Sequence, residues 1–439
     1  MSKSLQAAFL FWLKPARPVA LPRLQPRFAP SLAFGARRGQ FMVLFAIALV
    51  ALVGMAGLAV DVGFFWNQRR RIQSAADAGA VAGAQELLQG NSTDVTSAAQ
   101  TDASLNGFTN GVNGASVSVA NPPTSGPYAG NADAVQVTVT QPQSSFFLNA
   151  LSFSSFTLSA SAVAAFDPSP TCIYSLGSSG SSSLNASSGA TMQSACGMLV
   201  NSSSPDALTV SSGATIQAPA IGVVGNYSNS GGTISPTPTT GLAPVNDPLA
   251  GMAAPEVGSC NYNNFAAQAG AVLSANPGVY CGGISVTSGA TLTLNPGTYI
   301  LDGGGLSVNS GGILNGSGVT FYNTEGAAAY QPVSVTSGGT MNLSAPTSGT
   351  YEGILFFQDR NISSQDASMA NVFNSGSALN LEGTLYFPTS PLDFSSGGAA
   401  TAYTILVASQ VSFTSGSVIN DNYSSLQNGS PIKTVSLVE

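Results

Sequence analysis

Acidic side chains in the C-terminal part are the first candidates for chemistry, because two carboxylates at a defined separation hydrolyse glycosidic bonds. Lyases that act on polysaccharides need instead a basic residue, and Arg360 is the only one between Arg71 and Lys433. The acidic residues around it are scattered, at Asp302, Glu325, Glu352, Asp359 and Asp366. The chain also has no histidine, the commonest general base and transition-metal ligand. These residues therefore predict a protein that is not an enzyme.

Cofactor and nucleic-acid binding also lack the residues that they need. The glycine-rich run "DGGGLSVNSGG", which starts at Asp302, has neither the lysine nor the helix start of a phosphate-binding loop. Of the 12 Lys and Arg residues, 10 lie at or before Arg71, whereas a nucleic-acid site needs basic residues in clusters. We therefore expect no cofactor, no nucleic acid and no small-molecule substrate.

The residues after Phe166 form a repeating pattern of short β-rich runs and Ser-Gly turns. The spacing is 24 residues from Gly189 to Gly213 and 22 from Gly289 to Gly311, which is typical of one coil of a solenoid. Residues 168–439 are therefore predicted to form a parallel β-helix-like solenoid, with a Pro/Gly/Thr-rich linker at about 228–259. An antiparallel sandwich or barrel of short strands is the alternative. The repeated turns begin at Ser187, Ser211, Thr287, Asn309 and Thr336.

Four cysteines lie in this region, and an even number favours disulfides in an oxidising compartment. No Cys-x-x-Cys motif accompanies them, so a zinc site is not expected. Cys172 and Cys196 are 24 residues apart, and Cys260 and Cys281 are 21 apart, close to the length of one repeat. Residues one repeat apart lie in adjacent coils at about 4.8 Å, within reach of a disulfide. The sequence therefore predicts the pairs Cys172–Cys196 and Cys260–Cys281.

The N-terminal part has the features of a membrane anchor. Phe41 to Val60 is a run of 20 residues without charge, long enough to cross a hydrocarbon layer of about 30 Å. Seven basic and no acidic residues precede it, which predicts a cytoplasmic N-terminus and export of everything after Trp66. The apolar run is longer than that of a cleaved signal peptide, and "GLAVDVGFF" is a poor cleavage site. Residues 1–36 are expected to be a disordered basic cytoplasmic tail.

The anchor is predicted to continue outside the membrane as a helix. Helix-forming residues without proline extend from Val62 to Leu88, and Gly90-Asn91 is a suitable stop, so residues 37–90 form one anchor and protruding helix. Residues 91–167 contain one helical segment and several alternating strands, which predicts a small α+β unit. The fold is therefore mainly β, with a transmembrane helix extended into a long helix, a small α+β unit and the solenoid.

Five residues of the long helix are candidates for contacts. Gly79 and Gly83 lie in a stripe of small residues that suits close approach of a partner's helix or packing on the protein's own domain. Asp61 is expected either to be solvated at the end of the apolar run or to contact another membrane helix. Gln73 and Asp77 are one turn apart and can link along one helix face, although a solvated face is the simpler interpretation.

The stretch "GQFMVLFAIALVALVGMAGLAVDVGFFWNQRRRIQSAADAGAVAGA" resembles the N-terminal segment of TadE/TadG-like Flp pilus-assembly proteins. The resemblance rests on Gly39-Gln40, on Ala59 to Asp61, on Arg71 and Gln73, and on the run "AADAGAVAGA". The cysteine-bearing region, with "PGVYCGGISVTSGATLTLNPGTYILDGG", resembles the extracytoplasmic part of the same family.

The resemblance implies a non-enzymatic, single-pass protein of the bacterial inner membrane, with a cytoplasmic N-terminus and a periplasmic or extracellular body. Its partners would be the lipid bilayer and other pilus-assembly membrane proteins, and it would assist assembly or anchoring of a Flp/Tad-type pilus. The alternatives are a surface adhesin and a β-helix protein that binds or acts on carbohydrate. Some family members carry an Asp-x-Ser-x-Ser metal site, but the runs at Asp366 and Asp393 lack the second serine, so no such site is expected.

Overall fold

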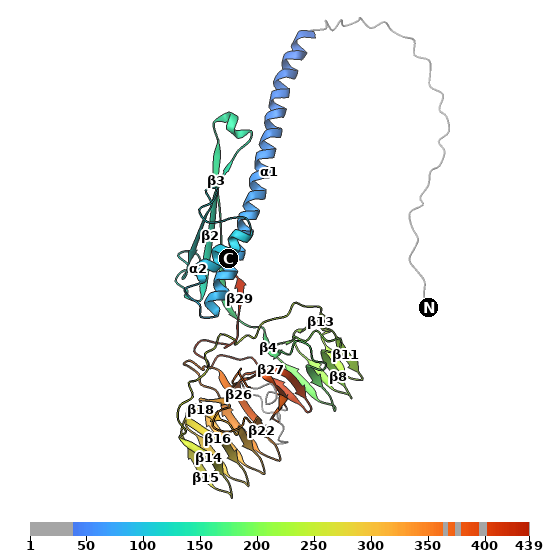
Figure 1. Cartoon of the computed structure of the whole chain (residues 1–439). Helices are drawn as coiled ribbons and strands as arrows, with labels where there is room; N and C mark the ends of the chain where they lie inside the picture. The colour runs from blue at the N-terminus through green and yellow to red at the C-terminus, as the bar shows by residue number, and fades with distance from the viewer. Residues whose placement is uncertain (1–37, 363–367, 374–378, 395–401, 439) are drawn as a thin grey trace, which may run out of the picture.

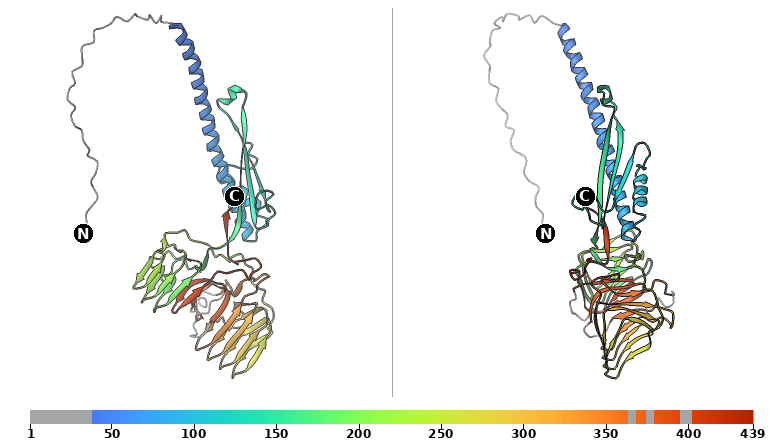
Figure 2. Two further views of the ribbon diagram at one scale, coloured as in Figure 1. Left: turned by 180° about the vertical axis from the view of Figure 1, so that it is seen from behind. Right: turned by 90° about the vertical axis from the view of Figure 1, so that its left-hand side faces the viewer.

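The computed structural model describes residues 38–438, except 363–367, 374–378 and 395–401 (Figure 1). The tail expected at residues 1–36 lies outside the described residues. The described chain consists of a long helix, a small sheet beside its C-terminal half, and a solenoid that lies across the end of the helix (Figures 1 and 2). It is mainly β, as the sequence predicts, and the parallel solenoid is confirmed.

The long helix α1 runs without interruption from Arg38 to Leu88, 51 residues in all. Its stretch Phe41–Leu88 is long and apolar enough to cross a membrane, and the apolar window is almost wholly exposed rather than buried in a core. The described residues of α1 are buried only from Ile72 onward, apart from Gly57 and Asp61. One half of the helix is therefore available to lipid, and the other half belongs to the folded body.

A small α+β unit packs against the buried half of α1. Its sheet has the strand order β1-β2-β3-β29, in which all pairs are antiparallel. The last strand comes from the C-terminus, which the sequence placed in the solenoid, and it covers the edge of β3 that would otherwise lack partners. Lys433 on this strand forms an ion pair of 3.6 Å with Asp133. The elements are α2 (Val95–Leu105), β1 (Ser116–Ala120), β2 (Ala134–Ser144), the short helix η1 (Leu148–Leu151), β3 (Ser155–Pro168) and β29 (Lys433–Leu437).

The solenoid consists of two blocks of stacked coils, and every pair between its named strands is parallel. The first block contains β4 (Thr171–Ser175), β5 (Leu184–Ala186), β6 (Thr191–Ser194), β7 (Gly197–Val200), β8 (Leu208–Ser211), β9 (Thr215–Gln217), β10 (Ile221–Val223), β11 (Tyr227–Ser230), β12 (Thr233–Ser235) and β13 (Thr239–Thr240). The last three strands occupy part of the predicted linker, so the linker is shorter than expected.

The second block is larger and includes the bulkiest strands. It contains β14 (Tyr262–Ala267), β15 (Val272–Ala275), β16 (Gly278–Val286), β17 (Thr291–Leu294), β18 (Gly297–Asp302), β19 (Leu306–Val308), β20 (Ile313–Ser317), β21 (Val319–Thr324), β22 (Val333–Val335), β23 (Thr340–Ser344), β24 (Ile354–Gln358), β25 (Asn371–Phe373), β26 (Leu379–Phe394), β27 (Thr404–Phe413) and β28 (Ser417–Ile419).

The Ser-Gly pairs mark the corner where each coil turns. Ser288 and Gly289 both have positive φ, 55° and 70°, which is the geometry of a type I′ turn. Glycine accepts this geometry without strain, and the same pair of positive φ values recurs at the other four predicted turns. The corner therefore returns once per coil, and strand partners keep the predicted spacing, with Met192 opposite Ile216 and Leu292 opposite Leu314.

The two blocks are joined in an order that differs from the order of the sequence. The last long strand, β27, pairs with the first strand, β4, so that the end of the second block stacks on the start of the first. Residues 241–261 therefore have to return from β13 at one end of the stack to β14 at the other (Figure 1). Ten strand spacings separate the two ends, about 48 Å, and 21 extended residues reach about 70 Å. We call residues 241–261 the strap.

Aromatic rings stack through the core of the second block. Ring centroids are 4.5 Å apart for Tyr262 and Tyr280, 5.7 Å for Tyr280 and Tyr299, and 5.6 Å for Tyr299 and Phe321. Tyr262 is the strand partner of Tyr280, and Tyr299 is the strand partner of Phe321, so these rings lie directly above one another in adjacent coils. Tyr299 pairs with Gly278, two residues from Tyr280 on the same face of the strand. The stack buries large apolar surface where one coil alone could not.

Alkaline pH is expected to unfold the second block. Burial raises the pKa of Tyr299 to about 12. An unfolded tyrosine titrates near pH 10, so the folded state holds this proton more tightly, and the stabilisation is complete below about pH 10. It is lost as the pH rises through about 12. Circular dichroism and tyrosinate absorbance should change together, and Tyr299→Phe should weaken this pH dependence. Ionisation of the tyrosines well before unfolding would contradict the expectation.

Candidate functional site

The carboxylate of Asp61 holds the tip of the β2–β3 hairpin against α1. Asp61 is fully buried, and it accepts backbone N–H bonds from Phe146 at 2.9 Å, Phe147 at 2.9 Å and Leu148 at 2.7 Å. Hydrogen bonds to an ionised group are the strong ones, and three of them replace the water that the carboxylate loses. Asp61 is thus not exposed as the solvated cap that the sequence favoured, and its three bonds come from the protein's own hairpin.

Aromatic contacts extend this attachment along the helix. The ring centroids of Phe64 and Phe146 are 5.2 Å apart, and those of Phe65 and Phe156 are 5.3 Å apart. Both pairs have the edge-to-face geometry. A Cβ atom at Gly57 would come within 2.8 Å of the Phe147 ring, so that ring rests directly on the helix backbone, inside the apolar run. The hairpin tip thus follows α1 on both sides of Asp61.

The small-residue stripe of α1 packs inside the protein's own unit. A Cβ atom at Gly79 would lie 2.9 Å from the Ala99 carbonyl oxygen of α2, and one at Gly83 would lie 3.1 Å from Val135 of β2. The alanines of the stripe, Ala76, Ala80 and Ala84, are fully buried. Of the two sequence interpretations, packing on the protein's own domain is the one that these contacts favour.

Gln73 and Asp77 form the link along the helix that their spacing allows. The Gln73 side-chain amide donates to Asp77 at 2.7 Å and also to the Ser161 carbonyl of β3 at 3.2 Å. Both side chains are half-buried, so the solvated face that the sequence favoured is only partly present. The pair therefore joins α1 to the sheet as well as linking one turn to the next.

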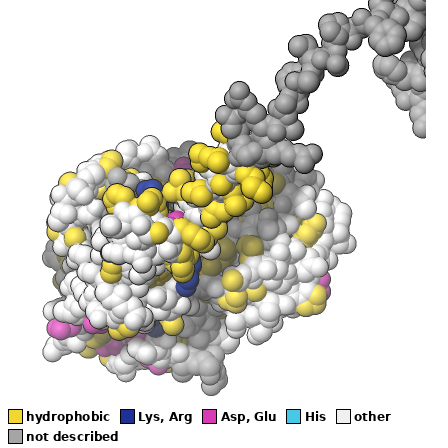
Figure 3. All heavy atoms as spheres, turned by 90° about the horizontal axis from the view of Figure 1, so that it is seen from above, with side chains coloured by type: hydrophobic (Ala, Val, Ile, Leu, Met, Phe, Trp, Pro, Cys, Tyr) yellow, Lys and Arg dark blue, Asp and Glu magenta, His cyan; other side chains and the backbone are white. Residues whose placement is uncertain are grey.

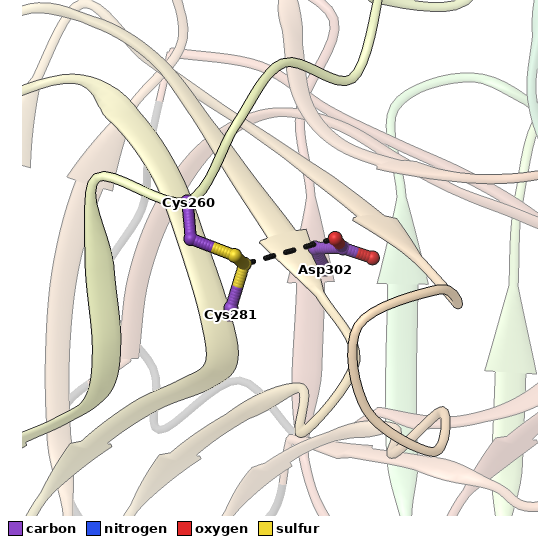
Figure 4. A group of neighbouring side chains, drawn as sticks. All are labelled: Cys260, Cys281 and Asp302. Atoms are coloured by element: carbon purple, nitrogen blue, oxygen red, sulfur yellow. Dashed lines mark hydrogen bonds between the residues drawn. A yellow bond between two sulfur atoms is a disulfide. The ribbon is translucent and has the colours of Figure 1, made fainter.

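The cysteines form the two disulfides that the repeat length predicts. Cys172 is bonded to Cys196 with Cα atoms 5.7 Å apart, and Cys260 is bonded to Cys281 with Cα atoms 5.6 Å apart. The first bond joins adjacent coils at the start of the first block. The second fixes the C-terminal end of the strap to β16 (Figure 4).

One group of potential metal ligands lies at this second disulfide. The sulfur atoms of Cys260 and Cys281 and a carboxylate oxygen of Asp302 all lie within 4.8 Å of one another (Figure 4). The sulfur atoms are bonded to each other and offer no thiolate, which is the form of cysteine that binds a metal. Asp302 also accepts the Ala327 backbone N–H at 3.0 Å. The oxidised cluster therefore does not fit a metal site.

Arg360, the one basic residue of the solenoid, fastens the strap rather than facing a cleft. Its guanidinium donates to Tyr386 at 2.6 Å and to the carbonyls of Met252 at 3.0 Å and Leu249. It pairs with Asp247 at 3.8 Å. These contacts hold the middle of the strap over the junction between β24 and β26.

Among the described residues, the scattered carboxylates of the solenoid make separate contacts and do not form a pair. Glu352 accepts two bonds of 2.6 Å from Asn428, and Asp359 accepts a bond of 2.7 Å from Thr324. Glu325 is exposed, and Asp366 lies outside the described residues. Asp393 is bonded to Thr414 at 3.3 Å, and burial raises its pKa. The bonds of Glu352, Asp359 and Asp393 join separate segments of the chain, which is the work of structural contacts rather than of a carboxylate pair.

Loss of the Arg360 side chain is expected to release the strap. Arg360→Ala removes the ion pair and three hydrogen bonds, for which about 1–3 kcal/mol of local stability is a reasonable expectation. A protease of broad specificity should then cut residues 241–261 faster than in the unchanged protein. The matched control is Asn361→Ala, because Asn361 is exposed and bonds only to its neighbour Asp359. Equal cleavage rates for both variants would contradict this function of Arg360.

A long exposed apolar helix that continues into a folded unit defines a membrane anchor carrying a body. Residues 39–86 match the family model described as putative Flp pilus-assembly TadE/G-like, and residues 82–164 match that described as putative Tad-like Flp pilus-assembly. No curated protein and no solved structure matches the chain. The resemblance is therefore confirmed over residues 39–164, which contain the apolar helix and the small unit packed on it. The families point to assembly rather than catalysis, and the solenoid lies outside both matches.

Proposed function

We propose that this protein is a non-enzymatic, single-pass component of the bacterial inner membrane that helps to assemble or anchor a Flp/Tad-type pilus. The observation that carries the proposal is the coincidence of the two family matches with the anchor and the unit packed on it. The matched residues pack as one unit. Asp61, Gln73 and the small-residue stripe of α1 contact the small α+β unit beside the helix. The solenoid is then the body that this piece presents.

Two features support export of the body. Seven basic residues and no acidic ones precede Phe41, against three arginines at Arg69 to Arg71, which favours a cytoplasmic N-terminus. Both disulfides lie after the anchor, and disulfides persist in oxidising compartments such as the periplasm. Reporter fusions after Gln85 should therefore be active only with a reporter that works outside the cytoplasm. Activity only of a cytoplasmic reporter would refute this topology.

The assembly function is tested by removing the protein from cells that make the pilus. We expect pili to be lost or greatly reduced, and to return when the full-length chain is supplied. Normal numbers of pili with lost attachment would favour the surface adhesin instead. Turnover of pectin-like or alginate-like polymers by the purified protein would favour the carbohydrate-active alternative. Chemical crosslinking in membranes should join the chain to other pilus-assembly proteins, and crosslinks only to unrelated proteins would count against the proposal.

A further inference from the structure

The tip of the β2–β3 hairpin exposes a group of large apolar side chains beside the anchor. We call this group the apolar lip; its members are Phe146, Phe147, Leu151, Phe153 and Phe156, which are 37–68% exposed. No charged residue lies between Asp133 and Asp167, so the whole hairpin is uncharged. In the view from above, hydrophobic side chains gather in the middle of the face, and only a few charged side chains lie around them (Figure 3). An exposed apolar patch of this kind marks an interaction site.

The position of the lip along the anchor indicates that lipid covers it. If the apolar run Phe41 to Val60 fills the hydrocarbon layer, its outer boundary lies next to Asp61. Phe147 rests on Gly57, four residues further in, which is about 6 Å along a helix. Interfacial apolar groups are typically buried about 5–10 Å into the boundary between headgroups and acyl chains. The lip is therefore at the depth where a membrane covers it.

Most backbone N–H groups of the tip have hydrogen-bond partners within the protein. Hydrocarbon offers no partner for an N–H group, so each one placed there has to be satisfied within the protein. Asp61 accepts those of residues 146–148. Those of residues 145, 150, 152 and 153 donate to carbonyls within the tip. The charge of Asp61 is also enclosed by these bonds, so the single carboxylate at the end of the run need not face lipid.

Residues just outside this depth suit the interface. Trp66 is 67% exposed and lies about 8 Å beyond Asp61, the level at which tryptophan is enriched in membrane proteins. Arg69, Arg70 and Arg71 are exposed about 12–15 Å beyond Asp61, where they can meet lipid phosphates. A soluble partner would explain the apolar lip but not this succession of apolar, aromatic and basic levels.

We propose that the apolar lip inserts into the outer leaflet of the bilayer, as a second membrane contact beside α1. The inference rests on the proposed membrane anchoring, and it does not depend on the pilus. Two adjacent contacts, joined by Asp61, resist tilting of the unit more than one helix does. The lip would thus fix the direction in which the body is held away from the membrane.

The experiment uses the full-length protein, one copy per lipid nanodisc, with single cysteines carrying a fluorophore. Leu151→Cys reports the lip, Val50→Cys reports the anchor, and Ser125→Cys at the other end of the unit reports water. The native cysteines are paired and do not react. We expect the fluorophores at positions 151 and 50 to be shielded from iodide and quenched by spin-labelled lipid. The fluorophore at position 125 should be quenched by iodide and not by spin-labelled lipid.

The three positions separate the possible failures. If Val50 is open to iodide, the membrane anchoring itself is wrong. If Val50 is shielded and Leu151 stays open to iodide, anchoring stands and the lip inference is overturned. Shielding of Leu151 only after other pilus-assembly membrane proteins are added would also overturn it, in favour of a protein contact. Quenching of Leu151 by spin-labelled lipid in the protein alone is the supporting result.

Discussion

Gly79→Leu is expected to unfold the small α+β unit while leaving the anchor helix intact. The added side chain would start 2.9 Å from the Ala99 carbonyl oxygen and 3.3 Å from Val137, and neither neighbour is a flexible chain end that can move aside. Overpacking of this kind typically costs about 1–3 kcal/mol, and a contact with backbone puts this position at or above the upper end. Since small domains are stable by only about 5–15 kcal/mol, the loss should be plain in thermal unfolding and proteolysis.

The matched control is Gly63→Leu in the same helix. No atom lies within 4 Å of a Cβ at Gly63, and the helix gains from losing a glycine in either variant. In detergent, the full-length Gly63→Leu variant should therefore keep the melting temperature of the unchanged protein. In the Gly79→Leu variant, the small α+β unit should lose its resistance to proteolysis. If Gly79→Leu instead melts like the control but no longer crosslinks to other pilus-assembly proteins, the stripe would be a partner surface after all.

Local patterns predicted the parts of the fold that depend on local spacing. The length of the apolar run gave the anchor, and the return of Ser-Gly after 22–24 residues gave the coils, because a type I′ corner needs those residues once per turn. The disulfides followed from the same spacing, because cysteines one repeat apart lie in adjacent coils. The same repeat occurs at Ala269-Gly270, where the alanine conceals it from a search for Ser-Gly.

Contacts between distant segments could not be predicted in this way. The partners of Asp61 lie 85–87 residues away, in a loop whose backbone N–H groups carry no sequence signal. Nothing in Lys433–Leu437 distinguishes a strand of the small sheet from one more solenoid strand. A Pro/Gly/Thr-rich stretch reads as a linker, although β11 to β13 form a further coil there. Such pairings are decided by which edges remain open after the local elements have formed.

The junction between the two solenoid blocks is the clearest case, and Ile173→Asp is expected to break it. Ile173 is fully buried between Leu406 of β27 and Met198 of β7, its strand partners on either side. A carboxylate placed there has no partner, and burying an unpaired charge is among the few changes that cost about 4 kcal/mol or more. Because this pairing joins the two blocks into one stack, the blocks should unfold in separate transitions when it is lost.

Calorimetry and circular dichroism of the full-length protein in detergent test this expectation. The unchanged solenoid should unfold in one transition, and Ile173→Asp should give two, with the first block melting earlier. Thr293→Asp, at an exposed position of β17, should leave the single transition in place, because its carboxylate stays in water. Ile173→Val should lower the melting temperature slightly without dividing the transition, because it removes one methylene, about 0.5–1.5 kcal/mol, and keeps the strand pair. A single, unshifted transition for Ile173→Asp would mean that the strap and the small sheet, rather than the pairing of β27 with β4, hold the blocks together.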